Sequence, residues 1–161
     1  MMDLTVVETG DENIAEQIAA RLGEEKSYGD CLFVRKVGTL ADVGRVKPDL
    51  LVLSPSSSAE RTGRTEKTRC GFLLLPGDAG GDGVEADCVV TYGMSPKNTL
   101  TLSSIGEEAC VLALQRELPT ASGGVVERQE IKIRGGLRPD ILLAVAGALL
   151  ILGHYRPEPN G

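Results

Sequence analysis

Short, unbroken runs of aliphatic residues recur along the part of the chain that precedes residue 93. The clearest run is Leu50–Leu53, which follows Pro48 and Asp49 and contains no polar residue. Such a run is typical of a strand covered on both faces, because a strand with one wet face alternates polar and apolar residues. The strands expected in this part of the chain are residues 4–7, 31–34, 50–53, 72–75 and 88–92.

The segments between these strands can form crossover connections. Residues 11–22 have helical periodicity, with Asp11 as the expected N-cap and Gly23 as the stop signal. Residues 39–46 are consistent with a shorter helix. Strands separated by such crossovers favour a mostly parallel sheet with helices on its faces.

The pattern changes after Gly93. Residues 99–105 and 109–118 are extended runs joined by a short glycine-containing turn, which indicates a hairpin. Residues 125–133 alternate apolar with charged side chains. We therefore expect a β meander with one solvent-facing side.

A final helix is expected near the C-terminus. It opens at Arg138–Asp140, with proline near its first position, and ends at Gly153. Its uncharged apolar stretch, Ile141–Leu152, covers twelve residues. A membrane span needs about 20 residues, so we interpret this stretch as a buried helix.

The length and composition fit one domain. Of the 161 residues, 42% are apolar, which is enough for one sizeable core. We predict a single α/β domain over residues 1–155, a three-layer, Rossmann-like, mostly parallel sheet with an added antiparallel meander and a C-terminal helix. Its parts are the parallel βα segment 1–97, the meander 98–134 and the helix 137–153, followed by a polar tail at 156–161.

The charge balance excludes several classes of partner. Acidic residues outnumber basic residues by 23 to 17, so the net charge is −6. Nucleic-acid-binding proteins usually carry a basic face with stacking aromatics, and anionic membrane surfaces attract basic segments. We therefore expect no nucleic-acid partner and no membrane partner. The first residues have no basic flank and no apolar stretch of signal-peptide length, which predicts a cytoplasmic protein.

No cofactor and no metal are predicted. The four cysteines form no C-x-x-C pair and lie in or beside apolar runs, which favours buried, reduced thiols. A disulfide framework and a zinc site are the alternatives. His154 is the only histidine, so a multi-histidine metal site is excluded. Its position just past a helix end favours a capping role.

Residues 85–153 resemble the central domain of the Mur ligases, the ATP-dependent enzymes that form peptide bonds in cell-wall synthesis. The segment Val90–Pro96 is similar to a V-T-Y-G-x-S segment near the end of that domain. In the family, extended strands then lead to a glycine and an alanine-rich helix that ends in Leu-Gly. The stretch from Gly135 to Gly153 has the same pattern. The resemblance implies that this chain has the fold of that domain and that it comes from a bacterium.

Two departures from the Mur pattern bear on activity. Mur ligases carry a G-x-x-G-K-[ST] loop that holds the ATP phosphates, whereas the first strand here leads into the acidic segment Glu8–Glu12. The H-N-x-x-N segment of the family falls on Leu137, Arg138 and Ile141, which are apolar or basic. The resemblance therefore implies a relative without ATP-dependent ligase activity.

The first half of the chain is similar to a response-regulator receiver domain. The similarity lies in residues 6–14, where acidic residues follow the first strand, and in Lys47–Leu53. In that family an aspartate at the end of the third strand accepts a phosphoryl group, but this position is Ser54 here. A serine lacks the carboxylate that forms an acyl-phosphate, and it does not hold Mg²⁺ comparably.

The segment 54–69 has the most unusual composition. It is rich in serine, threonine and arginine, and it follows a strand on the carboxyl edge, where open α/β sheets bind ligands. Hydroxyl and guanidinium groups suit a phosphate or a carboxylate. The anion-binding candidates are Ser56, Ser57, Arg61 and Arg64. A solvated loop and a peptide-recognition loop are the alternatives.

Two further features fall on the same edge. The loop 76–83 is rich in glycine and aspartate, which favours a flexible turn and disfavours phosphate. Tyr92, Ser95 and Lys97 suggest a Ser/Lys/Tyr arrangement, but the sequence does not bring the three side chains together. We predict no catalytic residue.

These observations leave two function hypotheses. The first is a non-catalytic module that acts through protein contacts or as a homo-oligomer, using the exposed edge of the meander. The second is a sensor of a small anionic, phosphate-like or nucleotide-like ligand that uses the loops 54–69 and 76–83. A ligand that requires Arg61 and Arg64 would favour the second hypothesis.

Overall fold

The computed structural model describes residues 2–23, 32–57, 67–79 and 83–154. In this part of the chain, one sheet has the strand order β10-β7-β6-β5-β4-β3-β1-β2, and β8 and β9 form a separate pair. The first elements are β1 (Met2–Val7), α1 (Ile14–Gly23), β2 (Leu32–Val37), the 3-10 turn η1 (Leu40–Val43), β3 (Leu50–Leu53), β4 (Thr68–Pro76) and β5 (Val84–Tyr92). The remaining elements are β6 (Leu100–Ile105), β7 (Ala109–Leu114), β8 (Leu118–Pro119), β9 (Val125–Val126), β10 (Gln129–Arg134) and α2 (Pro139–Ile151).

The parallel half of the sheet runs from β2 through β1, β3 and β4 to β5. All four residues of β3 are buried. Leu50 and Val52 pack into the core beneath the two α-helices, whereas Leu51 and Leu53 pack into a smaller core on the opposite face. The unbroken apolar run therefore belongs to a strand covered on both sides, as predicted.

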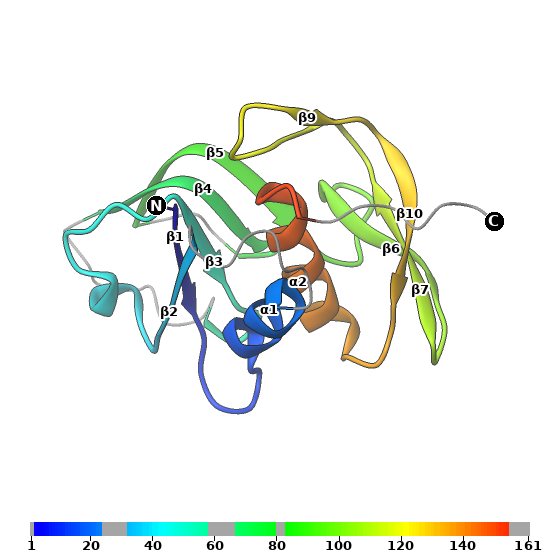
Figure 1. Ribbon diagram of the computed structural model, residues 1–161, viewed down its shortest axis with the longest axis horizontal. Coiled ribbons are helices and arrows are strands. Elements are labelled where there is room, and N and C mark those ends of the chain that lie inside the picture. The colour runs from blue at the N-terminus through cyan, green and yellow to red at the C-terminus, as the bar shows by residue number, and fades with distance from the viewer. Residues whose placement is uncertain (1, 24–31, 58–66, 80–82, 155–161) are drawn as a thin grey trace.

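The two faces of the sheet are covered unequally. α1 and α2 lie on the same face and contact each other, so both contribute to the larger core (Figure 1). On the other face, the described residues contribute η1, whose Leu40 and Val43 close the smaller core. The predicted α/β class with a mostly parallel sheet is confirmed, but the third layer is a short 3-10 turn and not a helix over 39–46.

The meander extends the sheet beyond the carboxyl end of the parallel strands. β6 pairs with β5 in parallel at a single position, Tyr92 with Leu100. β6, β7 and β10 then form antiparallel pairs. In Figure 1 the parallel strands lie on the left and these antiparallel strands on the right, with α1 and α2 between them. The predicted meander and C-terminal helix are therefore confirmed.

Helix α2 is buried from Ile141 to Ile151. Gly147 lets it approach the sheet closely, because a Cβ there would lie 2.7 Å from Leu100 Cδ1. The helix ends as predicted at Gly153, which has a φ of 77°. The amides of Gly153 and His154 donate to the carbonyls of Leu150 and Leu149, which is a Schellman motif.

Among the described residues, no helix is long and apolar enough to cross a membrane.

Helix α1 begins later than predicted. It starts at Ile14, not at Asp11, because Gly10 and Asn13 have φ values of 64° and 54° and interrupt a helical path. The carboxylate of Glu8 caps the helix, since it accepts hydrogen bonds from the amides of Ile14 (3.2 Å) and Ala15 (2.9 Å). The predicted N-cap Asp11 is therefore wrong.

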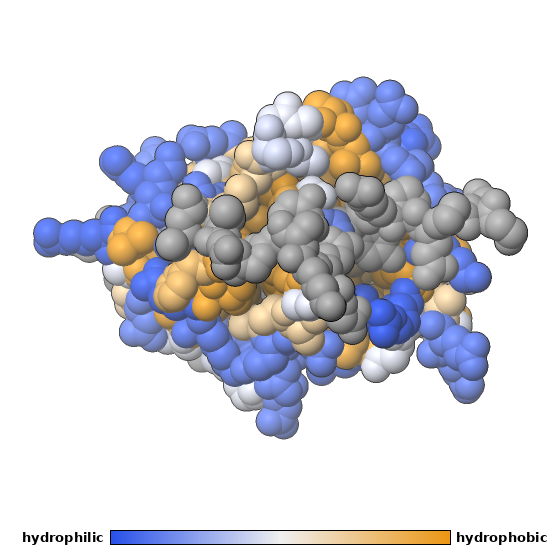
Figure 2. Space-filling model, viewed as in Figure 1, coloured by the Kyte–Doolittle hydropathy of each residue, from blue (hydrophilic) through white to orange (hydrophobic). Residues whose placement is uncertain are grey.

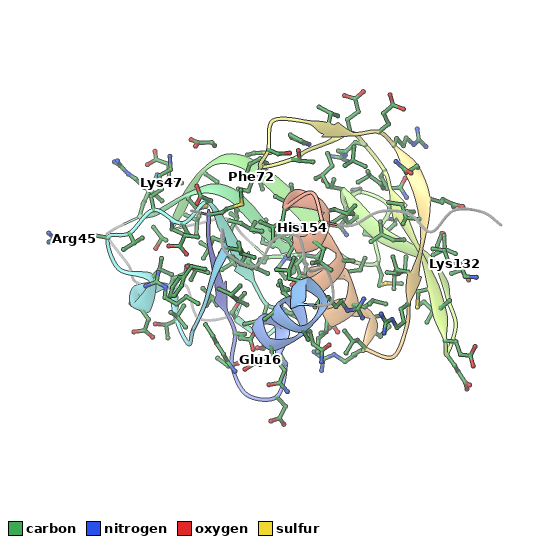
Figure 3. The ribbon with its side chains drawn as sticks, in the orientation of Figure 1. Glu16, Arg45, Lys47, Phe72, Lys132 and His154 are labelled. Atoms are coloured by element: carbon green, nitrogen blue, oxygen red, sulfur yellow. The ribbon has the colours of Figure 1, made fainter. Side chains whose placement is uncertain are left out.

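Polar and apolar residues occupy different parts of the face shown in Figure 2. Figure 2 shows hydrophilic residues around the periphery of one face, with smaller apolar areas between them. Arg45 and Lys47 project from one end of the molecule and Lys132 from the other, so both ends carry basic side chains (Figure 3).

The described cysteines carry free thiols, as the favoured interpretation predicts. Cys70 and Cys110 are buried and Cys88 is half-buried, while Cys31 lies outside the described residues. Burial is the main reason why the pKa of the Cys70 thiol rises to about 12, and the negative charge of Asp87 adds to the effect.

We expect Cys70 to be protected from alkylation in the folded protein. At pH 8 a thiol with this pKa is ionised in about one molecule in ten thousand, and only the thiolate reacts. Iodoacetamide labelling followed by peptide mass spectrometry should modify Cys70 roughly a thousandfold more slowly before unfolding than after it. Equal rates in both states would contradict the buried position of this thiol.

Candidate functional site

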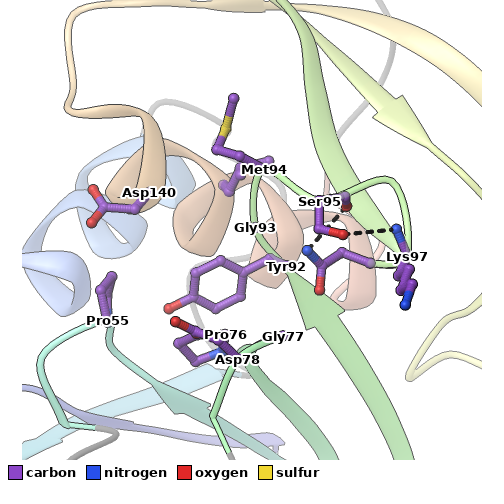
Figure 4. Close-up of a pocket in the computed structure, with 12 residues that line it drawn as sticks. Pro55, Pro76, Gly77, Asp78, Tyr92, Gly93, Met94, Ser95, Lys97 and Asp140 are labelled. Atoms are coloured by element: carbon purple, nitrogen blue, oxygen red, sulfur yellow. Dashed lines mark hydrogen bonds between the residues drawn. The ribbon is translucent and has the colours of Figure 1, made fainter.

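A pocket lies at the carboxyl edge of the parallel strands. Its volume is about 530 Å³, within the range of about 300–1,000 Å³ that is usual for small-molecule sites. The segments that follow β3, β4 and β5 line it together with the first turn of α2 (Figure 4). The lining residues are Pro55, Pro76, Gly77, Asp78, Tyr92, Gly93, Met94, Ser95, Lys97, Asn98, Asp140 and Leu143. Open α/β sheets bind their ligands at this edge.

Tyr92 forms the centre of the pocket floor. It is 1% exposed, and its hydroxyl donates a hydrogen bond of 2.8 Å to the carbonyl of Leu53. Burial, with added effects from the carboxylates of Glu12, Asp140 and Asp78, strongly raises its pKa. Tyr92 therefore stays protonated and does not act as a base, and its almost fully buried ring supports the pocket floor from within the core.

Asn98 forms one wall of the pocket and is 6% exposed. Its backbone amide and its side-chain Nδ2 both donate to the carbonyl of Ser95, at 3.1 Å each. The side chain fills the space left by two glycines. A Cβ on Gly77 would lie 1.6 Å from Asn98 Oδ1, and a Cβ on Gly93 would lie 2.7 Å from Asn98 Nδ2.

The substitution Gly77→Ala should therefore displace Asn98. We expect it to lower the free energy of unfolding by about 1–3 kcal/mol, because an added methyl group in a filled space forces its neighbours to shift. In the double variant Gly77→Ala/Asn98→Ala the steric conflict is absent, so the two losses should not add. Urea unfolding of the three variants measures this coupling, and strictly additive losses would contradict the packing described above.

The charged residues of the pocket differ in their pairing. Asp140 accepts a hydrogen bond of 2.6 Å from Arg138 Nε and one of 2.8 Å from the amide of Ile141. Its charge is therefore compensated within the first turn of α2. Asp78 and Lys97 are exposed, and no side-chain hydrogen bond or ion pair joins either of them to another described residue.

A hydrogen-bonded cluster, which we call the Glu12 cluster, lies beside the pocket. The Glu12 carboxylate accepts hydrogen bonds from the hydroxyl and amide of Ser56 and from the amide of Thr9. Arg138 Nη2 lies 4.0 Å from it. Burial alone would raise the pKa of Glu12, but the hydrogen bonds from Ser56, Ser54 and Thr9 outweigh it and lower the pKa. Glu12 is thus held in its ionised form.

A second carboxylate occupies the N-terminus of α1. Besides capping Ile14 and Ala15, the buried Glu8 lies 3.4 Å from Lys36 Nζ. The free amides at a helix N-terminus are a common binding site for phosphate groups. Here the amides already have a carboxylate as their acceptor, so this end of the helix is closed to a phosphate.

The residues predicted to bind an anion have different surroundings from those expected. Ser56 is bonded to Glu12 and, at 2.8 Å, to the hydroxyl of Thr9. Ser57 is buried, and its hydroxyl donates to the carbonyl of Ser54. Arg61 and Arg64 lie outside the described residues. Anion binding by these four residues therefore remains a prediction.

The structure does bring other sequence-identified residues together. Tyr92, Ser95 and Lys97 all line the pocket, and so does the start of the 76–83 loop. Ser95 Oγ accepts a hydrogen bond from the Lys97 backbone amide at 3.3 Å. Residues 80–82 lie outside the described residues. His154 lies past the end of α2 (Figure 3), where its amide helps to cap the helix.

Sequence reasoning missed five pocket residues, which are Gly93, Met94, Asn98, Asp140 and Leu143. The available signal was the pair of glycines after β4 and β5, since both mark positions where another group comes close to the backbone. Among the described residues, no group of three or more His, Cys, Asp and Glu side chains could hold a metal ion.

No protein-family model matches this chain, and no curated protein matches it.

Proposed function

We propose that this protein is a non-catalytic binding domain for a small molecule, which occupies the pocket between the β3–β5 strand ends and the first turn of α2. The observation that carries the proposal is the pocket itself. Three strand ends and a helix end converge on about 530 Å³ of space that combines a buried aromatic ring with charged groups on the rim. Such a combination is usual in small-molecule sites.

The interactions in the pocket favour binding over catalysis. A nucleophile needs a neighbouring base within hydrogen-bond reach. The Ser95 hydroxyl accepts from a backbone amide, and the Tyr92 hydroxyl donates to a carbonyl. Neither hydroxyl is bonded to a carboxylate, lysine or histidine side chain in the described residues. These groups can orient a ligand, but they are not activated.

We further propose that the chain is related to the Mur ligase central domain without its ATP-dependent activity. The order of a parallel sheet, an antiparallel meander and a buried C-terminal helix supports this relationship. The Glu8 carboxylate on the α1 amides supports the loss of the phosphate site. Ligand binding would then use the α2 side of the sheet and not the α1 end.

Amide chemical shifts provide the test of pocket binding. ¹⁵N-labelled protein is titrated with a panel of nucleosides, sugars, organic acids and amines. A pocket ligand should shift the amides of residues 77–79, 92–95, 97 and 98. Ser95→Phe, which fills the pocket, should abolish these shifts, whereas Ser103→Phe, on the exposed part of β6, should leave them intact. If no compound moves these amides, the proposal is wrong.

Self-association through the meander is a second candidate function. The observation in its favour is that β10 ends the sheet and pairs only with β7 in the described residues. Its outer edge is therefore available for strand addition by a second copy of the chain. Sedimentation equilibrium should then report a dimer or a larger assembly, and a strictly monomeric protein would contradict this candidate.

A further inference from the structure

The outer edge of β10 restricts how a second copy of the chain can pair with it. We infer that two copies associate about a two-fold axis at Ile131, with their β10 strands antiparallel and Glu130 of each copy opposite Lys132 of the other. This inference rests on the second candidate function, self-association, and adds the register and the charge pattern of the contact to it.

The backbone groups of β10 alternate between its neighbour β7 and its outer edge. The two strands are antiparallel, and beyond them the amide of Gly135 donates to the carbonyl of Glu108 at 2.9 Å. In an antiparallel pair, residues that exchange such bonds recur at every second position. The odd-numbered positions of β10 therefore bond to β7. The backbone amides and carbonyls that face the outer edge are those of Glu130, Lys132 and Arg134.

The side chains of these three residues lie on the face of the sheet opposite α2. All three are exposed, whereas Ile131 and Ile133 between them are buried in the core that α2 covers. A two-fold axis perpendicular to the sheet keeps the buried faces of both copies on the same side. Antiparallel pairing about this axis then places exposed residues directly opposite exposed residues, because a slip by one position would exchange the two faces.

The charges of β10 favour one of the registers that remain. Opposite charges directly across two strands stabilise the pair, and like charges destabilise it. With the axis at Ile131, Glu130 lies opposite Lys132 twice. With the axis at Lys132, two contacts between Glu130 and Arg134 are opposed by two lysines that face each other on the axis. An axis at Glu130 brings two glutamates together, and an axis at Ile133 places Lys132 opposite Arg134.

One like-charged contact remains at the margin of the favoured register. Arg134 falls opposite Arg128, which precedes β10 and is not part of its ladder. The new ladder between the copies covers residues 129–133, so both arginines lie at its ends. Both are exposed, and solvent and salt screen their repulsion.

Charge substitutions on β10 test the register. In Glu130→Lys or Lys132→Glu, both cross-strand pairs would carry like charges, so the dissociation constant of the dimer should rise at least about tenfold. The double variant Glu130→Lys/Lys132→Glu exchanges the signs and restores two pairs of opposite charge. Its dissociation constant should therefore return to within about threefold of the wild-type value. Sedimentation equilibrium of the full chain measures all four proteins.

The double variant also separates the registers from one another. With the axis at Lys132, it would place a lysine opposite Arg134 and two glutamates on the axis, so the dimer would be weakened further. The matched controls are Glu117→Lys and Lys67→Glu. They make the same changes of charge at exposed positions outside β10 and should leave the dissociation constant unchanged.

Amide hydrogen exchange provides a second readout. In the favoured register the amides of Glu130 and Lys132 donate to carbonyls of the other copy. Their exchange should slow at least about tenfold when the protein concentration is raised through the dissociation constant, because bonded amides exchange only after local opening. The amide of Ser103, in the middle of β6, should show no such dependence on concentration.

The outcomes separate this inference from self-association itself. A wild-type dimer that is insensitive to the single substitutions, or a double variant as weak as the single variants, would overturn the register and leave self-association in place. So would a dimer in which the amides of Glu130 and Lys132 exchange at a rate independent of concentration. A strictly monomeric wild-type protein would overturn both the inference and the second candidate function.

Discussion

The substitution Leu142→Ala is expected to lower the free energy of unfolding by about 3–5 kcal/mol, the range for a leucine removed from a core that cannot collapse around the cavity. Leu142 is completely buried on α2, within the core that α1, α2 and the sheet share. α2 also contacts β3, β4, β5 and β6, so it joins the parallel strands to the meander. A cavity at Leu142 therefore weakens both halves at once.

The matched control is Leu22→Ala on α1, where the leucine is only half-buried against the same core. We expect a loss below about 1.5 kcal/mol there, because less apolar area is removed from contact. Urea unfolding followed by circular dichroism measures both variants. Comparable losses at the two positions would contradict the central place of α2 in the fold.

The second large effect is expected for Glu8→Ala, which should cost about 2–4 kcal/mol because two buried amides lose their acceptor. The amides of Ile14 and Ala15 begin α1, and both residues are buried. The Glu8 side chain is itself fully buried and lies 3.4 Å from Lys36 Nζ. The substitution therefore removes a helix cap and an ion-pair partner together.

Glu16→Ala is the control for the ion pair alone. Glu16 also bonds to Lys36, at 3.3 Å, but its side chain is 57% exposed and caps no amide. An exposed ion pair contributes about 0–1 kcal/mol, so this variant should unfold nearly like the wild-type protein. Glu8→Gln should give an intermediate loss, because an amide oxygen can still accept one of the two hydrogen bonds. Equal stability of the Glu8 and Glu16 variants would rule out the capping role.

Much of the secondary structure could be predicted because its signals are local. The apolar run Leu50–Leu53 indicates a strand that is buried on both faces, and the alternation after Val125 indicates a strand with one exposed face. Gly153 likewise marks the end of α2 through its own backbone conformation. The N-cap prediction failed because two nearby carboxylates compete for the same helix amides, and the backbone path decides which of them reaches these amides. Asp11 has the chemistry of an N-cap, but Glu8 reaches the helix amides instead.

The candidate site was only partly predictable for the same reason. Tyr92, Ser95 and Lys97 could be placed on the carboxyl edge of the sheet, since parallel strands bring their ends together. Whether Ser56 faces a ligand or the protein could not be predicted, because its partner Glu12 comes from another loop.

Hydrophobic periodicity was sufficient to predict the α/β class, the parallel strands, the meander and the buried final helix, because it encodes which face of each element is covered. That α1 and α2 share one face of the sheet became visible only in the folded structure. The same is true of the pocket that Asp78 and Asp140 line together, and of the carboxylate that already occupies the α1 amides. The first two features depend on how elements that are far apart in the chain pack against each other. The third depends on which of several polar groups lies within hydrogen-bond distance of the helix amides. Such competition leaves no periodic signal in the sequence.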